Sequence, residues 1–109
     1  MKKLPLLFPL FLLMIACGGS DKPTTPKKAA PQVSEAEAKR LFNMRCSVCH
    51  GADGKLMIGG APDITLSTKT LAEREALITY GKGLMPPQKD VLSAAEIKAV
   101  AKYSMELSK

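Results

Sequence analysis

The chain has 109 residues, with 16 Lys and Arg against 10 Asp and Glu and a formal net charge of +6. This length allows one small domain. Most of the basic excess lies in the first 33 residues, because from residue 34 onward 11 basic and 9 acidic side chains leave only +2. That near balance gives no support to a nucleic-acid-binding protein.

The chain opens with a segment typical of secretory signals. Residues 1–3 are Met-Lys-Lys, and residues 4–15 are apolar but interrupted by Pro5 and Pro9. The stretch is too short and too broken by proline for a stable transmembrane helix. We therefore predict that residues 1–16 form a signal peptide that is removed from the mature protein.

Residues 13–17, Leu-Met-Ile-Ala-Cys, resemble the lipobox of bacterial lipoproteins, in which the cysteine is lipidated and becomes the first mature residue. This resemblance predicts a lipid anchor on Cys17. The alternative is ordinary cleavage after a small residue, which would leave an exposed unpaired thiol in an oxidising compartment. Residues 17–33 are rich in Pro, Thr and Lys and show no apolar period, which indicates an extended linker behind the anchor.

Residues 34–109 are predicted to form the folded domain. Three helix starts are marked by Ser or Thr with Glu three residues later, at Ser34, Thr70 and Ser93. The first helix is expected to run to Cys46, the second to stop at Gly81, and the last to continue to about Leu107. No segment shows strand alternation, so the sequence predicts an all-α fold.

Residues 46–50 read Cys-Ser-Val-Cys-His, the spacing typical of covalent attachment of a c-type haem. Two thiols at this separation reach neighbouring vinyl groups of one porphyrin, and the adjacent histidine lies under the iron. We predict that Cys46 and Cys49 bind one haem c and that His50 ligates its iron. The alternatives are a redox-active dithiol, which needs a preceding strand, and a zinc site, which needs four protein ligands.

A haem would also stabilise a domain of this kind. The folded part is small, and its only aromatic side chains are Phe42, Tyr80 and Tyr103. Domains of this size often need a cross-link or a bound group to supplement the core. A covalently held and mostly apolar cofactor would supply both.

An iron held by one histidine has a second axial position, and a thioether there favours electron transfer. The domain offers Met44, Met57, Met85 and Met105. Met44 is too close to the attachment motif to reach the other face of the ring, and Met105 falls at helical spacing with the core. Met85 lies in a loop with two prolines, an unusual place for a residue that only fills a core. We predict Met85 as the second axial ligand, with Met57 as the alternative.

The chain resembles the small class I c-type cytochromes over nearly all of residues 34–109. The shared features, in order, are Ala38 and Phe42, the C-x-x-C-H-G run, Gly60-Ala61-Pro62, Met85-Pro86 and Tyr103. The resemblance implies a cytochrome c fold of three to five short helices around the haem. It further implies that the Pro62 carbonyl accepts from Nδ1–H of His50, which orients the imidazole, and that Phe42 meets Tyr103 where the first and last helices cross.

The sequence thus predicts a monohaem electron carrier, lipid-anchored in a bacterial cell envelope and facing the periplasm or the outer side of the cytoplasmic membrane. Its expected partners are membrane-bound redox proteins, as donors and acceptors. No enzymatic activity is expected, because the only histidine is used on the iron. Two alternatives stay open: a haem sensor or small peroxidase with an open sixth position, and a cytochrome subunit of a larger redox complex. The lack of a second histidine argues against peroxidase chemistry.

Overall fold

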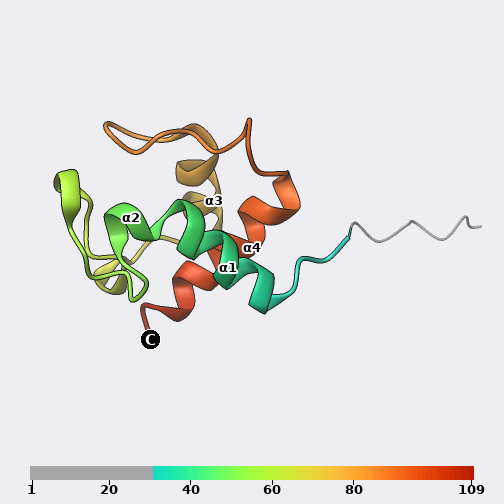
Figure 1. Cartoon of the computed structure of the whole chain (residues 1–109), viewed down its shortest axis with the longest axis horizontal. Coiled ribbons are helices and arrows are strands. Elements are labelled where there is room, and N and C mark those ends of the chain that lie inside the picture. Colours follow the sequence, from blue (N-terminus) through green and yellow to red (C-terminus); the bar gives the residue numbers. More distant parts are fainter. Residues whose placement is uncertain (1–30) are drawn as a thin grey trace, which may run out of the picture.

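The structure is a computed structural model that describes residues 31–109. Its elements are, in chain order, α1 (Glu35–Arg45), α2 (Ser47–His50), the 3-10 turns η1 (Ile58–Gly60) and η2 (Ile64–Leu66), α3 (Leu71–Tyr80) and α4 (Ala94–Glu106) (Figure 1). No strand occurs in this part of the chain. The predicted all-α fold is therefore confirmed.

The predicted signal peptide, the lipidation site at Cys17 and most of the linker lie outside the described residues. None of the helices in residues 31–109 is long and apolar enough to cross a membrane.

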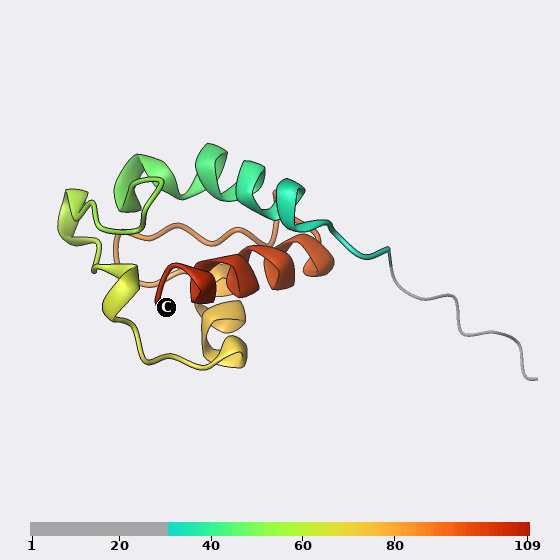
Figure 2. The ribbon, with the colours of Figure 1, turned by 90° about the horizontal axis from the view of Figure 1, so that it is seen from below.

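The core lies where α1 and α4 pack together. The two helices cross in Figure 1 and lie side by side in Figure 2. Phe42 of α1 and Val100 of α4 are the largest side chains buried completely, and each such burial stabilises the fold by about 1.5–3 kcal/mol. The rings of Phe42 and Tyr103 meet edge to face, with centroids 5.3 Å apart and planes at 61°. The predicted contact between these two aromatic residues is confirmed.

The starts of α3 and α4 follow the predicted capping pattern in full. At each start the Thr70 or Ser93 hydroxyl accepts from the backbone N–H of a glutamate three residues on, and that carboxylate accepts from the cap residue's own N–H. These reciprocal bonds pair two backbone donors that a helix start otherwise leaves unpaired. The predicted end of α3 is also confirmed, because Gly81 follows Tyr80 as its C-cap.

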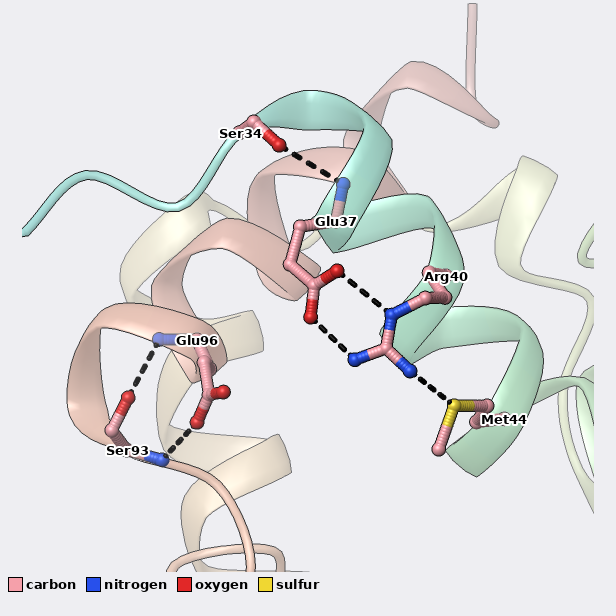
Figure 3. A network of polar contacts seen from close by, with 6 residues as sticks. All are labelled: Ser34, Glu37, Arg40, Met44, Ser93 and Glu96. Atoms are coloured by element: carbon pink, nitrogen blue, oxygen red, sulfur yellow. Dashed lines mark hydrogen bonds and ion pairs between the residues drawn. The ribbon is translucent and has the colours of Figure 1, made fainter.

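The start of α1 differs from the prediction. The Ser34 hydroxyl accepts from the Glu37 N–H at 3.2 Å, but the Glu37 carboxylate turns to Arg40 (Figure 3). Nε and Nη2 of Arg40 donate to its two oxygens at 2.8 and 2.5 Å. A bidentate salt bridge is stronger than one hydrogen bond to a backbone amide. The Glu37 carboxylate therefore binds Arg40 and not the N–H of Ser34. Half of this predicted capping box is therefore wrong.

Two long connections join the helices, one between α2 and α3 and one between α3 and α4. The segment from 51 to 70 holds η1 and η2, and a hydrogen bond of 2.8 Å from the Ile64 N–H to the Gly54 carbonyl closes the loop between these two residues. The segment from 81 to 93 joins α3 to α4 and runs, in orange, along the domain in both views (Figures 1 and 2). Both connections contribute residues to the cavity described next.

Candidate functional site

The predicted attachment residues share one helical turn. Cys46 caps the end of α1 and the start of α2, and its carbonyl accepts from the N–H groups of Cys49 at 3.2 Å and His50 at 3.0 Å. Residues three and four positions apart lie on the same face of a helix. The turn therefore presents two thiols and an imidazole to the same side, and Gly51, at a φ of 73°, then leads the chain away.

That side of α2 borders a cavity of about 960 Å³. This volume lies near the top of the range of about 300–1,000 Å³ found for small-molecule and cofactor sites. Most of the lining side chains are apolar, and they come from all four helices and both long connections. Every site residue predicted for the haem lines it: Cys46, Cys49, His50, Pro62 and Met85.

His50 is 9% exposed, and its Nδ1 lies 3.3 Å from the carbonyl oxygen of Pro62. A carbonyl only accepts hydrogen bonds, so this contact requires the proton on Nδ1. The lone pair is then on Nε2, the nitrogen left to bind a metal. The predicted pairing of these two residues is thus present in the structure, and it selects the tautomer that an axial ligand needs.

The burial of Cys46 and Cys49 tests the alternative that they form a redox-active dithiol. Cys46 is half-buried, whereas Cys49 is exposed. Burial raises the pKa of the Cys46 thiol to about 11, although the nearby Arg45 charge opposes the shift. A redox-active C-x-x-C motif works through a thiol whose pKa is lowered below its usual value. The environment of Cys46 therefore disfavours the dithiol interpretation.

Met85 is held in place by its backbone. It exchanges two hydrogen bonds of 3.0 Å with Lys82, which close a tight turn through Gly83 and Leu84. The side chain is half-buried against the core. The alternative ligand Met57 is 64% exposed. Among the four methionines of residues 31–109, Met85 alone lines the cavity.

Gly81 lets the Met85 loop lie close to the end of α3. Its φ of 70° and ψ of 174° belong to a region that only glycine adopts readily. A Cβ built there would lie 2.8 Å from the Pro87 nitrogen and closer still to the Met85 carbonyl oxygen. The backbone of the loop therefore occupies the space where any other residue would place its side chain.

The residues of the cavity wall fit a haem by their chemistry. Cys46 and Cys49 offer two thiols for attachment, and the free Nε2 of His50 offers a lone pair for the iron. Gln88 also lines the cavity, and its buried Oε1 has no hydrogen-bond partner among the described residues. A carbonyl oxygen needs a donor, and ionised propionates only accept, so a haem would not pair this atom.

Gln88 and Arg74 are among the residues of the cavity wall that were not predicted from the sequence. Arg74 had a detectable signal: it lies three residues after Leu71 and four before Ile78, on the apolar stripe of α3. A charged residue on that stripe predicts a buried guanidinium that needs hydrogen-bond acceptors. Gln88 follows two prolines in an irregular loop and had no comparable signal.

Comparison with known proteins agrees with this geometry. Residues 33–103 match the profile of the family described as "Cytochrome C oxidase, cbb3-type, subunit III". Cytochrome c6 of Leptolyngbya boryana is 32% identical over 77 residues, which make up 65% of this chain and 89% of that protein.

Two solved structures are similar in fold. Cytochrome c6 from the diatom Phaeodactylum tricornutum, 26% identical, aligns with a TM-score of 0.60 over 70% of this chain and 95% of that one. The c-type cytochrome KustC0563, 23% identical, aligns with a TM-score of 0.61 over 66% of this chain and 98% of that one. The chain therefore belongs to the small class I c-type cytochromes, electron carriers with a single covalently bound haem c.

Proposed function

We propose that this cytochrome is a monohaem electron carrier of the bacterial cell envelope, tethered to a membrane by a lipid on Cys17. Cys46 and Cys49 form the two thioether links, and His50 and Met85 are the axial ligands of the iron. The observation that carries the proposal is that all four of these residues lie in the wall of the same cavity of about 960 Å³.

Different residues of the chain would bind the haem, orient its ligands and exclude water. When bound, the haem supplies a reversible one-electron couple. The Pro62 carbonyl orients His50 and increases the basicity of its free nitrogen. The loop bonds between Lys82 and Met85 fix the backbone that presents the thioether. Buried side chains such as Phe42 and Ile78 keep water from the cavity wall.

We further propose that the protein is not an enzyme by itself. Glu73 is the only carboxylate in the wall of the cavity, as far as the described residues show. The backbone hydrogen bond from Thr70 lowers the pKa of Glu73, with help from the Thr70 hydroxyl. A carboxyl group with a lowered pKa is a poor general acid or base near neutral pH. This disfavours the small-peroxidase alternative.

The attachment of the haem is tested directly on the mature protein. Mass spectrometry after denaturation is expected to show one haem retained, because thioether bonds survive unfolding. Cys46→Ser and Cys49→Ser should each leave one link, and the double variant none. Release of the haem from the wild type by acid acetone would contradict the proposed attachment. The spectrum of the same oxidised sample tests ligation, since the weak far-red band of iron–methionine coordination should be present.

The lipid anchor is tested by location in the cell. Cys17→Ser is expected to move the protein from the membrane fraction to the soluble or unprocessed fraction, because acyl chains on Cys17 provide the stable attachment. Ser20→Ala, a neighbouring change that leaves Cys17 intact, serves as the control and should stay with the membrane. Wild-type protein in the soluble periplasmic fraction would refute the anchor while leaving the haem site untouched.

A second candidate is a cytochrome subunit of a larger redox complex. It is favoured by the description of the matching profile, which names an oxidase subunit. The two functions differ in the size of the native particle. Gentle detergent extraction followed by size separation should give haem at the mass of a single small protein if the chain is a free carrier, and at the mass of a complex if it is a subunit.

A further inference from the structure

Arg74 lies in the middle of α3 and is only 5% exposed, although it is charged. The same side chain borders the haem cavity. Its five N–H donors are all used: Nε binds the Lys69 carbonyl at 3.1 Å, Nη1 binds the carbonyl and hydroxyl of Ser104 at 2.8 and 3.0 Å, and Nη2 binds the Ser67 carbonyl and the Ser108 hydroxyl at 3.0 Å each.

Every one of these acceptors is neutral. The hydroxyls of Ser104 and Ser108 donate their own protons elsewhere, to the carbonyls of Ala101 and Ile64, so they face the guanidinium as acceptors. The ion pairs within residues 31–109 join Arg40 to Glu37 and Lys109 to Glu106. The guanidinium of Arg74 thus has its hydrogen bonds satisfied and its charge uncompensated by any described carboxylate.

Hydrogen bonding alone does not account for a charge at this place. Burial lowers the pKa of Arg74, but a guanidinium stays protonated in proteins. An ion without a buried counter-ion carries a large desolvation penalty, which a neutral donor would avoid. Beside it is the cavity proposed for the haem, whose charge would change by one with each electron gained or lost.

We propose that Arg74 sets the reduction potential of the haem through its charge. This inference rests on the proposed placement of the haem in the cavity. Ferric haem carries one more positive charge than ferrous haem, so a fixed cation beside it favours the ferrous form and raises the potential. No N–H of Arg74 is left to donate to the haem, so the effect is electrostatic and does not depend on a direct bond.

The expected size follows from Coulomb's law. If the separation from the iron is taken as about 10 Å and the effective dielectric constant as about 20, the ferrous-to-ferric ratio at a given electrode potential changes roughly tenfold. A tenfold change in a one-electron equilibrium equals about 59 mV. Because the guanidinium is buried, salt should screen it far less than an exposed lysine.

The experiment is a spectroelectrochemical titration of the full-length, haem-loaded protein and three variants. Arg74→Gln removes the charge and is expected to shift the equilibrium roughly tenfold toward the ferric form. Arg74→Lys disturbs the same hydrogen bonds but keeps the charge, and its shift should be less than about threefold. Lys69→Gln removes an exposed charge from the wall of the same cavity. In about 1 M salt, where the screening length is about 3 Å, the Lys69→Gln shift should vanish and that of Arg74→Gln should persist.

Equal shifts in Arg74→Gln and Arg74→Lys would show that the hydrogen bonds of Arg74, and not its charge, set the reduction potential. That result would overturn the proposal. No shift in Arg74→Gln would overturn it as well. Both results are distinct from a failure of the proposed function, which would appear as wild-type protein without covalent haem.

A second pair of variants decides the matter if the Arg74 variants do not fold. Ser108→Asp would set a carboxylate against the guanidinium, whereas Ser108→Asn offers a neutral group of the same shape. Ser108 is only half-buried, so either side chain should be tolerated. The Asp variant should be shifted toward the ferric form relative to the Asn variant, and identical potentials for the two would overturn the proposal.

Discussion

Met85→Ala is expected to lower the reduction potential by about 0.1–0.3 V, a part of the roughly 0.8 V range that axial ligands span. Thioether ligation stabilises the ferrous state, so its loss favours the ferric state. The haem should stay attached, because the proposed thioether links to Cys46 and Cys49 do not involve Met85. The far-red iron–methionine band should disappear, and carbon monoxide should bind the ferrous protein.

Met57→Ala is the matched control for this experiment. Met57 is 64% exposed and does not line the cavity, so its removal should leave the potential, the band and the resistance to carbon monoxide unchanged. If the Met85 variant keeps the wild-type potential and the Met57 variant does not, the assignment of the ligand is wrong. If neither variant changes the potential, a haem sensor with an open sixth position becomes the better interpretation of the site.

Gly81→Ala is expected to disturb the same proposed ligand through its backbone. The new Cβ would meet the backbone of Met85 and Pro87, and backbone cannot rotate aside as a flexible side chain does. The left-handed conformation of Gly81 adds strain of about 1–3 kcal/mol for a residue with a side chain. We expect a lower free energy of unfolding, a weakened iron–methionine band and a lower potential, measured on one sample by chemical denaturation and by titration.

Gly83→Ala separates the steric clash of a new Cβ with neighbouring backbone from the strain of a positive φ. Gly83 also has a positive φ, of 58°, but a Cβ there would find no atom of the described residues within 4 Å beyond its own chain neighbours. This variant should lose about 1 kcal/mol of stability through its conformation and keep the wild-type band and potential. Equal loss of the band in the two variants would show that the close approach at Gly81 does not position the ligand.

The features that could be predicted from the sequence depend on neighbours within one or two helical turns. The caps at Thr70 and Ser93 join residues three apart, and the C-x-x-C-H run places its thiols and imidazole by the geometry of a single turn. Such contacts need no knowledge of the rest of the fold. Resemblance to a family supplied the long-range pairs, of which Phe42 with Tyr103 is confirmed and His50 with Pro62 is found at 3.3 Å.

Tertiary structure decided the parts where one side chain has competing partners or reaches a distant segment. Glu37 has the right spacing for a capping box, yet Arg40 on the next turn takes its carboxylate. Arg74 finds acceptors 30 and 34 residues away, in Ser104 and Ser108, only because α3 packs against the end of α4. Its burial without a counter-ion depends on what surrounds it in space. Sequence spacing describes which groups can meet locally, but burial and the choice between partners are set by the packing of the whole domain.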